Sequence, residues 1–206
     1  MKHNVKLVIV ACNTASSLSL DFLKRCFRVP IIGVIGPGAG NAVNVTRNNR
    51  VGVIGTNATI SSGAYERAIK KISPRIEVYS RSCPLFVPLA EEGWTDLEVT
   101  HEIASIYLDP LKKKRVDTLI MGCTHYPLLK NTIRKVMGGS VHLVDSAAEV
   151  AKGAKNLLDA SGLLNDTPRA KRHKFFVSDE PEHFIKLSGR FLNRKMSNVS
   201  KHTPGV

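Results

Sequence analysis

Two stretches, KLVIVACNT (residues 6–14) and DTLIMGCTH (residues 117–125), share a pattern that predicts the fold class. Each is an apolar run that ends in a small residue and is followed by a cysteine and then by hydroxyl or amide side chains. An apolar strand that leads into a helix start is typical of the βα units that build parallel sheets. The sequence therefore predicts an α/β protein in which the same unit occurs twice.

The rest of the chain alternates short apolar runs with longer segments whose apolar residues recur every three or four positions. The short runs predict strands at residues 6–11, 30–35, 50–54 and 117–122, with weaker ones at 75–79 and 140–144. The longer segments predict amphipathic helices at residues 16–27, 61–72, 97–108, 127–136 and 147–161. Strands that alternate with helices indicate mainly parallel sheets flanked by helices.

The segment GPGAG (residues 36–40) interrupts this alternation. Glycine widens the accessible range of φ, and proline blocks both a helix interior and strand pairing. We therefore expect a hinge or crossover here, with a domain boundary close to it. The two cysteine-bearing stretches would then form half-sites that face each other in one active site at the domain interface.

Length and composition are those of an ordinary globular protein. The chain has 206 residues, of which 43% are hydrophobic and 23% charged, and this excludes a collagenous, low-complexity or mostly disordered chain. The longest apolar stretch, residues 29–45, is broken by several glycines, whereas a membrane helix needs about 20 apolar residues in a row. No segment is expected to span a membrane.

The chain is basic, with 30 Lys and Arg against 17 Asp and Glu and a formal net charge of +13. Such a charge favours an acidic partner, either a nucleic acid or an anionic metabolite. The basic runs at residues 112–115 and 169–174 are not accompanied by an aromatic-basic or helix-turn-helix pattern. A nucleic-acid-binding module is therefore only a minor alternative.

The cysteines indicate the compartment and argue against a structural metal. Cys12, Cys26, Cys83 and Cys123 are too few and too widely spaced for a secreted disulfide framework, and no C-x-x-C pair suggests zinc. We therefore expect a cytoplasmic protein without a metal site.

Cys12 and Cys123 are the strongest candidates for chemistry. Ligands of open α/β sheets bind beyond the carboxyl ends of the strands, which is where both cysteines are expected to lie. A thiol at a helix start is expected to have a lowered pKa and to act as a base. Two such groups on opposite faces of one carbon atom would racemise or epimerise it. The alternative is that each cysteine is a small buried apolar residue.

Polar residues beside the two cysteines suggest how a substrate would be held. His125 would take a proton from the Cys123 thiol or hold that thiol in place, or it would bond only locally. Asn13, Thr14 and Thr124 would bind a carboxylate together with backbone N–H groups at the helix starts. Thr14 and Thr124 would alternatively serve as N-caps.

Five motifs give the chain a specific resemblance, in the order VACNTAS (10–16), GVIGTNATI (52–60), CPLFVPLAEEG (83–93), GCTHYPLL (122–129) and VDSA (144–147). In this order they resemble the glutamate racemase family, and FFVSD (175–179) resembles the C-terminal end of its members. Aspartate racemases share the two cysteines but lack the His-Tyr-Pro continuation. An aspartate racemase is thus an alternative.

The resemblance implies an enzyme that interconverts L- and D-glutamate without a cofactor and supplies D-glutamate for peptidoglycan. It implies two α/β domains, one formed by residues 1–37 and 147–206 and the other by residues 38–146, and a homodimer. Cys12 and Cys123 would be the two bases.

The family also implies roles for the neighbouring residues. Asn13, Thr14, Thr124 and His125 would bind the substrate, and His125 and Glu91 would assist proton transfer. Taken by itself, the Glu-Glu-Gly that contains Glu91 is typical of a solvated surface.

Two motifs of the family are absent from the sequence, an Asp-Ser-Gly and a Pro-Tyr-Gly, which contribute to the substrate site. We therefore expect the first domain to be incomplete, with an exposed strand edge. An inactive, truncated racemase is the corresponding alternative. The linker also departs from the family, because Gly36 and Gly40 stand where Glu and Arg are common.

Overall fold

The computed structural model describes residues 5–165, 173–192, 196 and 198–202. The chain forms two compact units, of which the first ends at Leu164 and the second begins at Asn165. The basic run at residues 169–174 lies outside the described residues except for its last two members. In the part of the chain that the structure describes, no helix is long and apolar enough to cross a bilayer.

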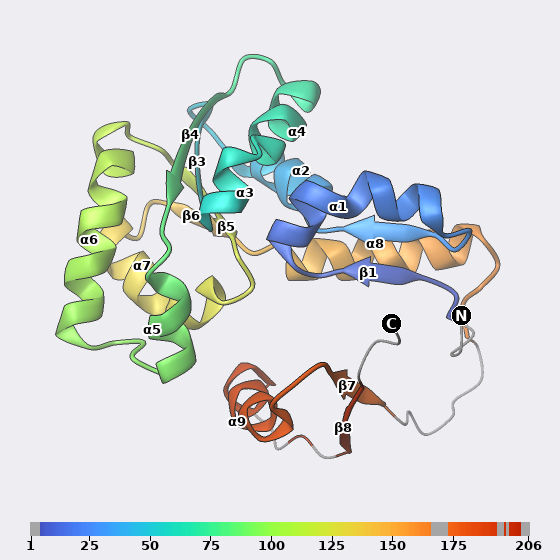
Figure 1. Cartoon of the computed structure of the whole chain (residues 1–206). Helices are drawn as coiled ribbons and strands as arrows, with labels where there is room; N and C mark the ends of the chain where they lie inside the picture. Colours follow the sequence, from blue (N-terminus) through green and yellow to red (C-terminus); the bar gives the residue numbers. More distant parts are fainter. Residues whose placement is uncertain (1–4, 166–172, 193–195, 197, 203–206) are drawn as a thin grey trace. The chain divides into compact units, whose positions relative to one another are not determined.

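A four-stranded parallel sheet forms the centre of the first unit (Figure 1). Its strands are, in spatial order, β4 (Glu77–Ser82), β3 (Arg50–Gly55), β5 (Thr118–Gly122) and β6 (His142–Val144). The two central strands, β3 and β5, are buried almost throughout. Strands that are covered on both faces are expected to have continuous apolar sequences, and the sequence predicts both strands for that reason.

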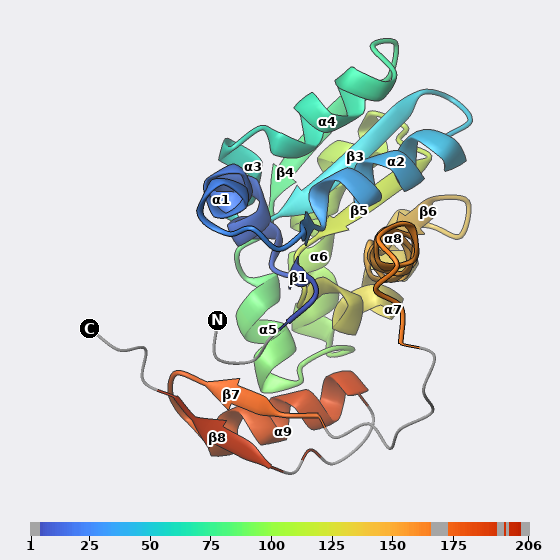
Figure 2. The same cartoon turned by 90° about the vertical axis from the view of Figure 1, so that its right-hand side faces the viewer.

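Helices cover both faces of this sheet (Figures 1 and 2). One apolar core lies under α5 (Phe86–Glu92), α6 (Glu98–Lys113) and α7 (Lys130–Met137). The core on the other face lies under α2 (Ile35–Val45), α4 (Ala64–Ile72) and α8 (Ala147–Ala160). The predicted α/β class, with parallel sheets flanked by helices, is confirmed.

A second parallel sheet pairs β1 (Val8–Val10) with β2 (Ile31–Gly33). The helix α1 (Asn13–Cys26) follows β1 directly, and its Ser16 hydroxyl donates to the carbonyl oxygen of Val10 at 2.8 Å. The same hydroxyl oxygen accepts from the backbone N–H of Val34 at 3.3 Å. Ser16 thereby ties the start of α1 to both strands and holds the residues after β1 in place.

The second unit contains a βαβ element that the sequence pattern did not predict. Strands β7 (Phe175–Val177) and β8 (Val199–Lys201) pair in parallel, and α9 (Pro181–Leu192) contacts β8.

Residues 36–40 are not a hinge loop, because they lie in the first turns of α2. The expected crossover is present, since α2 leads from β2 in one sheet to β3 in the other. Pro37 is tolerated in the first turn of α2, since the first backbone N–H groups of a helix have no intrahelical acceptor. Gly38 allows close packing, because a Cβ atom at this position would lie 3.3 Å from the ring of Tyr65. The expected domain boundaries themselves remain a prediction.

Several element bounds also differ from those expected. The predicted helix at residues 61–72 begins later, as α4 at Ala64, and a separate helix, α3 (Asn57–Ser61), precedes it. Gly63, at a φ of 63°, lies between the two. The predicted helix at residues 127–136 begins as a 3₁₀ turn, η1 (Tyr126–Leu129), before α7. The helix α5 was not predicted, because seven residues give less than two clear periods.

Candidate active site

Cys12 lies where the sequence places it, between β1 and α1. Its backbone is extended, its carbonyl oxygen accepts the first helical hydrogen bond, from Ser16 N–H at 2.8 Å, and its thiol is free and exposed. The side chain makes no capping hydrogen bond. An exposed thiol at the start of a 14-residue helix is open to a substrate, so the alternative of a buried apolar residue is wrong for Cys12.

Cys123 follows β5 and is buried, with 7% of its surface exposed. Burial raises the pKa of its thiol, the backbone N–H of His125 lowers it, and the charge of Cys12 raises it further. The net direction is upward, which corrects the expectation that the helix start would lower this pKa. The reason is that loss of hydration outweighs the backbone N–H groups. The effect of Cys12 on this pKa indicates that the charge of Cys12 acts on the Cys123 thiol.

His125 connects Cys123 to a carboxylate. Its Nδ1 lies 3.7 Å from the Cys123 Sγ, and its Nε2 lies 3.1 Å from Oε1 of Glu91. Glu91 belongs to α5, which packs against η1. A thiol, an imidazole and a carboxylate in this order form a proton relay of the kind that activates nucleophiles and bases. The Glu-Glu-Gly was expected to be solvated surface when taken by itself. Glu91 is instead partly buried and contacts His125.

Asn13 is buried at the start of α1 and is held by Tyr65. The Tyr65 hydroxyl donates to Oδ1 of Asn13 at 2.6 Å. This bond fixes the orientation of the amide, because its oxygen must face α4. Burial, then the charges of Asp145 and Cys123, raise the pKa of Tyr65, so the hydroxyl keeps its proton.

Thr14 ties α1 to the central sheet. Its Oγ1 lies 2.9 Å from Oγ1 of Thr56 and 3.1 Å from Oγ1 of Thr59, and Figures 1 and 2 show α1 beginning beside α3. Thr124 is exposed beside Cys123. Neither threonine is an N-cap, since Cys12 and His125 hold those positions. The structure thus brings together every candidate residue around the ends of β1 and β5.

Sequence reasoning missed Tyr65, Thr56 and Asp145. Thr56 follows β3 directly and Asp145 follows β6, so both lie at the same sheet edge as Cys123. The rule that ligands bind beyond the carboxyl ends of parallel strands applies to these positions too. Tyr65 lies in a helix, and nothing in its sequence context indicates a polar contact.

The basic run at residues 112–115 spans the last residues of α6 and the two residues that follow it. Lys112 lies 3.8 Å from Asp109, and Lys114 lies over the ring of Tyr79. Local partners of this kind indicate a solvated helix end, not a nucleic-acid interface.

Comparison with known proteins agrees with this geometry. Residues 1–154 match the Asp/Glu/Hydantoin racemase family. The fold and the two thiols that follow strands are consistent with this class of proteins. A glutamate racemase of Geobacter metallireducens is 53% identical over 197 residues, which are 96% of this chain and 73% of the relative. One from Chlorobaculum tepidum is 46% identical and covers 97% of this chain and 74% of the relative.

A solved structure gives the same result. The glutamate racemase of Francisella tularensis, in complex with D-glutamate, superimposes with a TM-score of 0.91 at 37% identity, over 98% of this chain and 75% of that chain. The chain belongs to the glutamate racemase family.

Proposed function

We propose that this protein is an isomerase that interconverts L- and D-glutamate by proton transfer between two thiols, without a cofactor. The observation that carries the proposal is the chain of contacts from Cys123 through His125 to Glu91, together with the effect of Cys12 on the pKa of the Cys123 thiol. Family membership supports glutamate as the substrate over aspartate.

The reaction needs one thiolate and one thiol. The Cys12 thiolate removes the α-proton, so the Cα–H bond breaks and its electron pair delocalises into the α-carboxylate. The Cys123 thiol gives its proton to the opposite face of the carbon, so a new Cα–H bond forms. Cys12 is then a thiol and Cys123 a thiolate, which is the state that runs the reverse reaction. The raised pKa of Cys123 favours the thiol form at the start.

His125 and Glu91 have supporting roles in this scheme. His125 stabilises the Cys123 thiolate by holding or returning a proton, and Glu91 orients the imidazole. Because Cys123 is buried, its thiolate needs this help more than the exposed Cys12 does.

Substrate carboxylates would be bound at the helix starts. The Asn13 amide nitrogen, the Thr124 hydroxyl and the backbone N–H groups of the first turn of α1 are suitable donors. The Thr14 hydroxyl is already engaged with two threonines, so we assign Thr14 a backbone contact.

The test is proton exchange at the α-carbon of glutamate in heavy water, followed by NMR, together with optical rotation. Cys12→Ala and Cys123→Ala should each lower racemisation by at least about 100-fold, the usual contribution of a positioned acid or base. Cys26→Ala is the matched control, since Cys26 is also free and exposed but lies at the far end of α1. Equal activity of the two site variants and the control would refute the mechanism.

We place this activity in the cytoplasm, where D-glutamate would serve peptidoglycan synthesis. All four cysteines are free, as expected in a reducing compartment. Detection of the protein in a periplasmic or secreted fraction would contradict this.

We also propose a dimer. Leu18 and Phe22 lie one turn apart on α1, and they are 62% and 59% exposed. Exposed apolar pairs favour protein association, and a two-fold axis brings the same patch of each copy together. Light scattering should show a dimer that Leu18→Ser with Phe22→Ser converts to a monomer, whereas Ile72→Ser, at an exposed apolar position on α4, should leave it intact.

A further inference from the structure

A cavity of about 780 Å³ lies at the opposite end of the central sheet from the two cysteines. It borders the end of α2, the starts of β5 and β6, and one side of α7, whereas Cys123 follows the end of β5. Its volume is in the range of small-molecule sites, roughly 300–1,000 Å³. Its polar lining includes Asn44, Arg47, Asp117, Lys130, Arg134 and His142.

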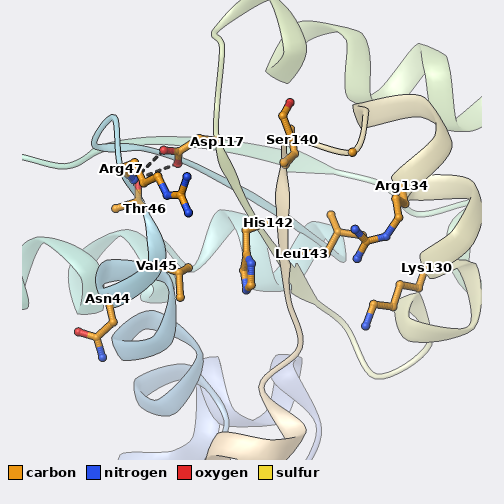
Figure 3. Close-up of a pocket in the computed structure, with 12 residues that line it drawn as sticks. Asn44, Val45, Thr46, Arg47, Asp117, Lys130, Arg134, Ser140, His142 and Leu143 are labelled. Carbon is orange, nitrogen blue, oxygen red and sulfur yellow. Dashed lines mark hydrogen bonds between the residues drawn. The ribbon is translucent and has the colours of Figure 1, made fainter.

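Basic side chains from three different elements line this cavity (Figure 3). Lys130 and Arg134 are one turn apart on α7 and therefore share a face of that helix. His142 on β6 lies between them and the end of α2, and Arg47 lies on the far side, near Asp117.

Asp117, the acidic residue of this lining, is already satisfied. Its carboxylate accepts from the Thr46 hydroxyl and from the backbone N–H groups of Arg47 and Asn48, each at 2.7 Å. Burial alone would raise the pKa of Asp117, but these hydrogen bonds together lower it. The carboxylate is thus engaged in holding the turn before β3, and among the described residues it forms no ion pair with Arg47, Lys130 or Arg134.

The cationic side chains of the cavity have no acidic partner among the described residues. Neither Arg47, Lys130 nor Arg134 forms an ion pair there. By contrast, Lys135 on the same helix lies 2.8 Å from Asp96. Unpaired cations that converge on a concave surface repel one another, and a bound anion relieves that repulsion.

We propose that this cavity binds a small molecule that carries at least two phosphate groups. The planar guanidinium groups of Arg47 and Arg134 match phosphate oxygens in a bidentate manner, and Lys130 adds a point charge. The Asn44 amide and the His142 imidazole can add hydrogen bonds. The concave shape and limited volume favour a small molecule over a nucleic acid strand. This site is separate from the proposed racemase centre and does not depend on it.

The experiment is calorimetric titration of the full chain with inorganic pyrophosphate. Saturable binding is expected, and Arg134→Gln and Arg47→Gln should each weaken it by about tenfold, as for the loss of a charge-assisted hydrogen bond. Lys135→Gln is the control, since it removes the same charge from the same helix but faces Asp96, and it should change affinity less than twofold. The far-UV circular dichroism spectrum and the urea denaturation midpoint should be the same in all four proteins, which shows that the variants are folded.

Three results would overturn the proposal. One is the absence of saturable pyrophosphate binding at millimolar concentration. Another is binding that Arg134→Gln and Lys135→Gln weaken equally, since that would show only an effect of net charge. The third is tighter binding of a single-stranded oligonucleotide than of pyrophosphate, with the oligonucleotide binding abolished by Arg134→Gln and Arg47→Gln. The cavity face would then be a nucleic-acid surface.

Discussion

Replacement of Tyr65 by phenylalanine tests how the site is held together. The variant keeps the ring, which packs against Gly38 and Gly122, and removes only the hydroxyl that donates to Asn13 at 2.6 Å. Asn13 is 4% exposed, so water cannot readily replace the lost donor. A buried acceptor without its donor costs about 1–3 kcal/mol.

The expected effect has two parts. The free energy of unfolding should fall by about 1–3 kcal/mol, with a decrease in Tm of about 2–4 °C for each kcal/mol in a chain of this size. The value of kcat/KM for glutamate should fall about tenfold. The Asn13 amide would no longer be held in its orientation, and a tenfold fall corresponds to about 1.4 kcal/mol less stabilisation of the transition state.

Urea denaturation and a circular-dichroism assay of racemisation measure the two parts. The control is Tyr79→Phe, which removes a hydroxyl that bonds to Glu77 on the surface and should change neither quantity. A Tyr65→Phe protein with the stability and kcat/KM of the wild type would refute the argument that this hydrogen bond positions Asn13.

Three other perturbations test the packing, the buried thiols and the relay. Gly122→Ala should lower the free energy of unfolding by about 1–3 kcal/mol, because the new Cβ would lie 2.7 Å from a carbonyl oxygen of β3. Gly40→Ala on α2 should raise it by about 0.5–1 kcal/mol, because no atom lies within 4 Å of the new Cβ there. Urea denaturation measures both changes. Burial raises the pKa of Cys83 to about 12. Between the unfolded pKa and this value, the thiol of the folded state stays protonated while that of the unfolded state loses its proton. Its contribution to stability is complete below the unfolded pKa of about 8.5 and is lost as pH rises toward 12. A pH series of denaturation curves should therefore be flatter for Cys83→Ala. Glu91→Gln should lower kcat about tenfold and change its pH profile, while Glu92→Gln should do neither.

The strands and the cysteine positions could be predicted because local sequence determines them. Both central strands are covered on two faces, so their apolar runs are unbroken, and Cys123 follows one of them directly. The same reasoning failed for α2, where glycine and proline indicated a hinge. The helix forms because Pro37 occupies the first turn and Gly38 fits against Tyr65, and the latter is a contact between distant segments.

The α/β class, the position of Cys12 and Cys123 after strands, and the family resemblance could all be predicted from the sequence, since each depends on neighbouring residues. Two contacts depend on how distant segments pack: His125 meets Glu91, 34 positions away, and Tyr65 meets Asn13, 52 positions away. The tertiary structure also decided the direction of the Cys123 pKa shift. A helix start alone lowers the pKa of a thiol, but burial is a property of the packed molecule, and here the loss of hydration is the larger effect.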